Sequence, residues 1–167
     1  MIGPDYVRMM AHYNAEMNRR LYAAADRLSD AARRQQRGAF WGSIHGTFSH
    51  LLWGDRMWMS RFDGWEPPPV KLPQSGAMVP DYAELRAQRF ETDAALEAWA
   101  SRLAPDGLQG ELTWFSGAAG REVTRDKAML VVHLFNHQTH HRGQAHAMLT
   151  AAGERTGDTD LMLVARG

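Results

Sequence analysis

The chain has 167 residues, 44% of them hydrophobic and 10% aromatic, which suits a single domain with its own core over residues 1–167. Nineteen basic and nineteen acidic side chains give zero formal charge, and no Lys/Arg run exceeds two residues, so a nucleic-acid partner is not expected. The chain contains no cysteine, which excludes disulfides and any protein thiol as nucleophile or metal ligand. We find no signal peptide pattern and no apolar stretch long enough to span a bilayer, so we expect a soluble cytoplasmic protein without a membrane partner.

Apolar side chains that recur every three or four residues predict four long helices. The predicted helices cover residues 4–29, 43–62, 81–103 and 124–152. Asp81 and Thr124 are expected to cap the third and fourth helices, and Gly153 to end the last one. On the third helix the pattern assigns five charged residues to the solvent side, namely Glu84, Arg86, Arg89, Glu91 and Asp93.

The segments between the helices carry weaker signals. The proline-rich stretch 64–76 is predicted to be extended, because proline disfavours helix. Residues 111–115 and 121–123 flank a Gly- and Ala-rich stretch and predict a short hairpin. The tail 154–167 is expected to be irregular and to pack through Leu161, Met162 and Leu163.

These elements predict an all-α fold, a four-helix bundle in up-down-down-up order. The short link between the first two helices favours antiparallel neighbours. The link between the second and third helices has roughly 17 residues and can cover more than about 50 Å, whereas a 20-residue helix is only about 30 Å long. This long crossover allows the third helix to start beside the beginning of the second and to run parallel to it.

Histidines concentrate on the fourth predicted helix, where four of the chain's eight fall within residues 133–141. His137 and His141 lie one turn apart on one face, so both can reach one ion, and His50 on the second helix is the candidate third ligand. A metal ion that performs chemistry usually takes three protein ligands and keeps one position open. A single inward histidine is more often a hydrogen-bonded core residue, but several on one apolar stripe favour a shared cation. The pairs His133/His137 and His137/His140 also have suitable spacing.

The surroundings of His50 leave alternatives open. Gly46 and Gly54 share its face and predict either open space for a substrate or close helix packing. Asp55 is either a buried partner, with Arg142 as a possible counterion, or an exposed residue at a subunit boundary. The remaining histidines have no supporting spacing and are expected to be ordinary surface or core residues, namely His12, His45 and His146.

Two segments carry a family resemblance. The patterns Ser-His50-Leu-Leu-Trp-Gly-Asp55-Arg-Met-Trp58 and Phe-Asn-His137-Gln-Thr-His140-His141-Arg-Gly-Gln144 resemble the DinB family, within the DinB/YfiT-like metalloproteins, over essentially the whole chain. The resemblance implies an up-down-down-up bundle, often a homodimer, and a divalent metal ion on the residues that match the family ligands. Those residues are His50, His137 and His141.

The resemblance also implies a class of chemistry, because some related proteins are transferases or isomerases that use a low-molecular-weight thiol such as bacillithiol or mycothiol. We therefore predict a metal-dependent enzyme, with zinc or nickel, that transfers a small thiol to an electrophilic small molecule. The alternatives are a metal-dependent hydrolase and a non-catalytic stress-response protein that binds a metal or another ligand. In the last case the ion would have four protein ligands and no open coordination position, with His133 or His140 as the fourth ligand. His133 and Gln144 are the candidates for side chains that contact the metal-binding histidines without binding the ion themselves.

Overall fold

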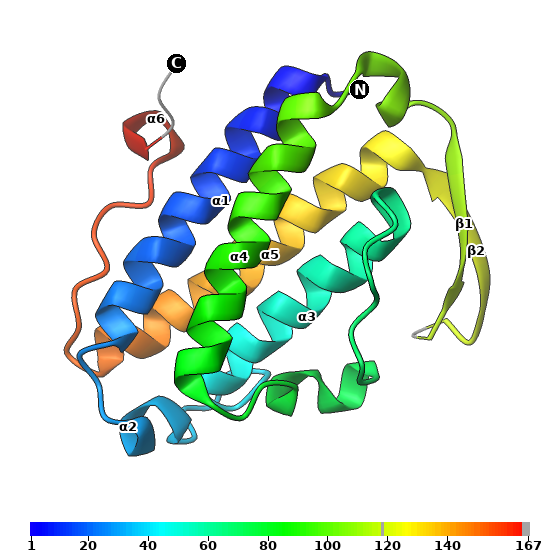
Figure 1. Ribbon diagram of the computed structural model, residues 1–167. Helices are drawn as coiled ribbons and strands as arrows, with labels where there is room; N and C mark the ends of the chain where they lie inside the picture. The colour runs from blue at the N-terminus through cyan, green and yellow to red at the C-terminus, as the bar shows by residue number, and fades with distance from the viewer. Residues whose placement is uncertain (118, 165–167) are drawn as a thin grey trace.

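The computed structural model describes residues 1–117 and 119–164. The chain is mostly helical, at 65%, and Figure 1 shows its long helices lying side by side, with a hairpin at one edge. The long helices are α1 (Pro4–Ala25), α3 (Ile44–Phe62), α4 (Tyr82–Arg102) and α5 (Lys127–Ala151). α1 and α3 each pack along both α4 and α5. The sequence thus predicted the helical class and the long elements.

The helices begin and end at capping side chains, and two helix ends differ from the prediction. Asp81 caps α4 as expected, accepting from the Glu84 backbone N–H at 2.8 Å. α1 ends at Ala25, because Ser29 does not continue that helix but caps a new short one, α2 (Asp30–Arg34). Capping side chains compete with helix continuation, which explains the early end of α1.

α5 begins after the predicted cap. Asp126 accepts from the Met129 backbone N–H at 2.8 Å and is the true cap, whereas Thr124 lies in a strand. The strands are β1 (Glu111–Ser116) and β2 (Arg121–Asp126), an antiparallel pair in which Thr124 faces Thr113. The all-α prediction is therefore corrected to a mostly helical fold with a small two-stranded sheet, at the place where the sequence indicated a hairpin.

The proline-rich connector is not extended throughout. It contains the 3-10 helix η1 (Leu72–Ala77), which packs on α3. Pro73 lies in the first turn of η1, where a missing backbone N–H has no cost, so the prediction of an extended path was wrong over these residues. A second 3-10 helix, η2 (Pro105–Leu108), follows α4.

The tail is also partly helical. It ends in a short helix, α6 (Leu161–Val164), where the sequence predicted irregular structure. Leu161 packs against α1, but Met162 and Leu163 are 83% and 64% exposed, so their predicted burial was wrong. Residues 165–167 of the predicted tail lie outside the described residues.

Charged side chains lie in the core between the long helices as well as on the surface. Arg89 and Asp93, predicted to face solvent, are only 1% and 4% exposed. One Arg89 nitrogen, Nη1, donates to Asp55 Oδ2 at 2.6 Å, and the other, Nη2, pairs with Asp93 Oδ1 at 2.8 Å. Asp55 is fully buried, and its cationic partner is Arg89 rather than Arg142.

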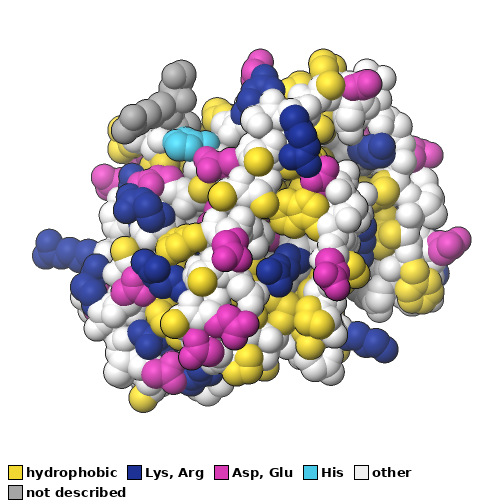
Figure 2. Space-filling model, viewed as in Figure 1, with side chains coloured by type: hydrophobic (Ala, Val, Ile, Leu, Met, Phe, Trp, Pro, Cys, Tyr) yellow, Lys and Arg dark blue, Asp and Glu magenta, His cyan; other side chains and the backbone are white. Residues whose placement is uncertain are grey.

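The polar core extends to all four long helices. Asn18 of α1 donates to Asp93, and Gln138 of α5 donates through Nε2 to Asp55 Oδ1 at 2.7 Å. Outside the core, Figure 2 shows acidic and basic side chains interspersed on the visible face. Among the described residues, no helix has the length and apolar character needed to cross a membrane.

The buried ion pair predicts a large loss of stability when one partner is removed. Arg89→Met leaves two buried carboxylates without their cation, and we expect the free energy of unfolding to fall by about 3–5 kcal/mol. The matched control is Arg86→Met on the same helix, since Arg86 pairs with Asp26 at the surface and its loss should cost less than about 1 kcal/mol. Urea denaturation of both variants measures the difference, and equal losses would contradict the assignment.

Candidate metal centre

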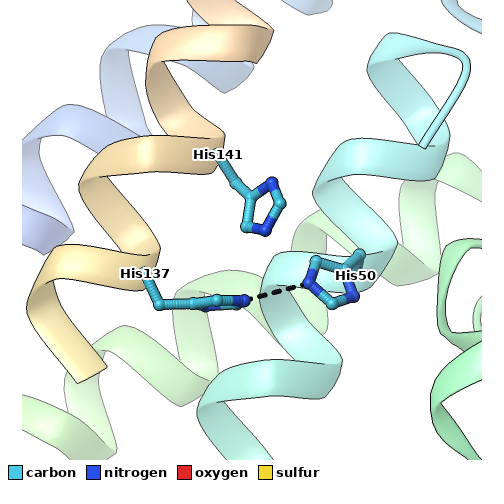
Figure 3. Close-up of side chains that lie close together, drawn as sticks. All are labelled: His50, His137 and His141. Atoms are coloured by element: carbon cyan, nitrogen blue, oxygen red, sulfur yellow. Dashed lines mark hydrogen bonds between the residues drawn. The ribbon is translucent and has the colours of Figure 1, made fainter. Parts of the chain in front are cut away.

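Three histidines from two helices meet beside the polar core. His50 projects from α3, and His137 and His141 project from successive turns of α5, as Figure 3 shows. One nitrogen of each ring lies within 4.8 Å of the others, and His50 Nε2 is 3.0 Å from His137 Nε2. The structure thus brings together the three residues that the sequence singled out, in a geometry that could hold a metal ion.

Hydrogen bonds from outside fix how two of these rings are turned. His141 Nδ1–H donates to Gln144 Oε1 at 2.8 Å, because a carbonyl oxygen can only accept, and this leaves His141 Nε2 with its lone pair. His50 Nδ1 contacts Ser75 Oγ at 2.9 Å, which leaves Nε2 to face His137. A partner on the second ring nitrogen is the usual way a protein orients a metal-binding histidine. Gln144 was predicted in this role.

Ser75 was not predicted, because it lies 25 residues away from His50 in the connector. η1 brings it against α3, and Ser49 Oγ donates to the Ser75 carbonyl at 2.8 Å. The only available signal was a serine among prolines, which has no spacing relation to His50. Its position depends on how the connector folds back.

The donor set fits a divalent ion. Two imidazole nitrogens at 2.0–2.1 Å from a tetrahedral ion are separated by about 3.3 Å, close to the 3.0 Å between His50 and His137. Imidazole nitrogen suits zinc, nickel and related ions. His50 Nε2 and His137 Nε2 face one another, so these are the nitrogens through which an ion between the two rings would bind.

The two glycines near His50 do not leave open space. A Cβ on Gly54 would lie 2.8 Å from His137 Cε1, so glycine is what allows the His137 ring to approach α3. A Cβ on Gly46 would collide with the backbone carbonyl of Trp41. Close helix packing is therefore correct for Gly54, whereas Gly46 packs against the loop that precedes α3.

Burial keeps the three imidazoles neutral. It lowers the pKa of His50 to about 3 and that of His137 to about 3, and neighbouring histidines add to both shifts. Burial also lowers the pKa of His141, while the bond to Gln144 acts in the opposite direction. A metal ligand must be deprotonated, so at neutral pH these lone pairs are available without competition from protons.

Aromatic rings cover one side of the group. Trp41 stacks on His50 with a centroid distance of 4.1 Å, and Trp53 lies 5.9 Å from the same ring. The other side is less covered, because His137 is only partly buried.

The other histidines of α5 lie outside the group. His133 is exposed, with its ring centroid 6.1 Å from that of His137 and 5.2 Å from that of Trp58. His140 is exposed and accepts from Gln144 Nε2 at 3.3 Å. The three histidines without supporting spacing make separate hydrogen bonds, His12 with Glu97, His45 with the Val79 carbonyl and His146 with Thr156.

The polar core holds the two ligand-bearing helices in register. Asp55 directly follows Gly54, and Gln138 directly follows His137, so the 2.7 Å hydrogen bond between Asp55 and Gln138 lies immediately behind the histidine group. A shift of one helix along the other would break this buried bond. The position of His50 opposite His137 is therefore fixed by the fold itself.

A mostly helical fold with three inward histidines on two neighbouring helices defines a candidate metal-binding protein. The DinB family model matches residues 4–167, nearly the whole chain, and the chain belongs to the DinB family. Comparisons with curated proteins and with solved structures gave no match.

The ligand assignment predicts which histidines retain a metal ion. Replacing His137 and His141 together by Gln should abolish zinc retention, because one ligand cannot hold the ion through gel filtration. His140→Gln is the matched control, since it removes an exposed imidazole next to His141 and should leave the zinc content unchanged. Elemental analysis after zinc loading measures the zinc content per chain. Full occupancy in the double variant would show that the ion lies elsewhere.

Proposed function

We propose that the protein is a divalent-metal enzyme that transfers a low-molecular-weight thiol to an electrophilic small molecule. The observation that carries the proposal is the group of three neutral imidazoles, which includes no carboxylate and no thiolate. A divalent ion, zinc or nickel, held by such ligands would keep its full positive charge and favour a thiolate over a thiol at neutral pH.

The roles of the residues follow from their contacts. His50, His137 and His141 would hold the ion, and Ser75 and Gln144 keep two of these rings turned toward it. Trp41 and Trp53 exclude water from the His50 side, which leaves the partly exposed His137 side for the thiol and its substrate. In the reaction the sulfur–carbon bond would form, a leaving group such as halide would depart with its electron pair, and the thiol proton would pass to a nearby base and from there to solvent.

His133 has a position from which it could receive that proton. Its ring centroid lies 6.1 Å from that of His137, and partial burial lowers its pKa, which favours the neutral imidazole. Neutral imidazole is an effective proton acceptor. We assign it this role within the proposed reaction.

Two other functions remain candidates. A metal-dependent hydrolase would use the same ligands to activate water in place of a thiol. A non-catalytic stress-response protein would need a closed site, and His133 and His140 are the histidines that could complete it. Both are exposed and neither belongs to the three-histidine group, which favours an open site.

The proposal extends to the setting of the protein. A free low-molecular-weight thiol is abundant in a reducing cytoplasm, so we place the protein there, with a small-molecule substrate and without nucleic-acid or membrane partners. For the long helices we propose the up-down-down-up order that the resemblance implies. The homodimer is proposed on the same ground.

Thiol transfer predicts that turnover requires both the metal ion and an added thiol. With chlorodinitrobenzene as electrophile, the zinc- or nickel-loaded protein should accelerate conjugation of glutathione, bacillithiol or mycothiol, and a chelator should remove the acceleration. The His137, His141 double Gln variant should fall to background, whereas His12→Gln should keep the full rate. Thiol-independent hydrolysis of an ester would instead support the hydrolase, and no rate above background in either assay would support the non-catalytic protein.

The dimer proposal also has its own measurement. Trp53, Met57 and Trp58 of α3 remain partly exposed, and a two-fold contact through this helix would cover them. Light scattering should then report twice the chain mass of 18.8 kDa at micromolar concentration. A mass of one chain would exclude the dimer and leave the enzyme proposal untouched.

A further inference from the structure

A cavity of about 200 Å³ lies on the opposite side of α5 from the histidine group. It is lined by α1, α5 and the segment that follows α5 and is open to solvent on one side, and none of the three inward histidines lines it. Its polar wall includes Arg20, Thr139, Arg142, His146 and Thr156, and its apolar wall includes Met17 and Leu21. The cavity therefore combines cationic and hydroxyl groups with a short aliphatic surface.

Arg142 is the central group of this wall. Its side chain is buried, with 5% of the residue exposed, and its Nη2 donates to Thr139 Oγ1 at the long distance of 3.4 Å. Its Nη1 has no hydrogen-bond partner among the described residues, and no carboxylate there forms an ion pair with it. A buried guanidinium without a paired anion is costly, so this site would gain from a bound anion.

The nearby acidic groups do not fill this role. Asp55 and Asp93 attract Arg142 through space, but both are bonded to Arg89. At the cavity wall, Arg20 donates to Glu16 and to the Asp158 carbonyl, and Glu16 is shared with Arg19. The cavity wall therefore keeps positive charge.

We propose that this cavity binds a small organic carboxylate. The carboxylate would pair with Arg142 and accept from Thr139, and its short aliphatic chain would lie against Met17 and Leu21. A water molecule occupies about 30 Å³ in the liquid, so the volume suits a molecule of a few heavy atoms, such as butyrate. This site is independent of the metal ion and of the proposed enzyme activity.

The test is calorimetric titration of the full-length protein with butyrate, with butyramide as its neutral counterpart and inorganic phosphate as the second anion. Butyrate should bind saturably, and butyramide should bind about tenfold more weakly or worse, because charge-assisted hydrogen bonds to Arg142 are lost. Equal binding of butyrate and butyramide, phosphate binding without butyrate binding, or no saturable binding of any probe would overturn the proposal.

Variants locate the site even if Arg142→Met fails to fold. Gly143 lines the cavity, and a Cβ there meets nothing within 4 Å, so Gly143→Leu should fold, fill the cavity and abolish butyrate binding. Ala147→Leu, at an exposed position one turn further along α5, is the control that should bind normally. Arg20→Gln should weaken binding, whereas Arg19→Gln, which removes the other Glu16 partner outside the cavity, should not. Unchanged affinity in Gly143→Leu would exclude this cavity.

Discussion

The buried ion pair between Arg89 and its two aspartates is the interaction on which the arrangement of the bundle depends. Arg89 of α4 reaches Asp55 of α3, Asp93 accepts from Asn18 of α1, and Asp55 accepts from Gln138 of α5, so one network joins all four long helices at mid-height. Apolar contacts between helices tolerate small sliding movements, whereas displacement of this network would leave charges unpaired in the core. The network therefore selects one register among several that the hydrophobic stripes alone would permit.

That register is also what assembles the histidine group. His137 and Gly54 are the immediate chain neighbours of Gln138 and Asp55, so the hydrogen bond that aligns α3 with α5 brings the His137 ring against Gly54, where α3 has no side chain. Burying three imidazoles together lowers their pKa values, so that protonating any of them costs free energy. Folding thus holds neutral nitrogen donors at close range, and a cation bound among them would offset part of this cost.

The sequence predicted those features that depend on spacing along one helix. The His137–His141 pair and the Asp81 cap are local relations, whereas His50 lies on another helix and was proposed as the third ligand before the family resemblance supported it. Prediction from the sequence was wrong where the chemical type of a residue and its position on the helix point to different surroundings. Arg89 and Asp93 continue the inner stripe of Leu85 and Leu96 at intervals of three and four residues, yet their charge suggested solvent, because a buried charge becomes plausible only when its partner on another helix is known. Ser75 could not be found for the same reason, since its contact with His50 exists only through the fold of the connector.

α5 carries different chemistry on its two faces, and this has a thermodynamic consequence. His141 and Arg142 are consecutive, so the helical rotation of about 100° per residue turns one toward α3 and the other toward α1. Gln138 anchors the same helix to the polar core between them. A molecule that bound on the α1 side and moved or stiffened this segment would also affect the metal-binding nitrogens on the α3 side, because one continuous hydrogen-bonded helix carries both. Because linkage is reciprocal, any such effect on metal affinity must equal the effect of the metal on affinity for the ligand.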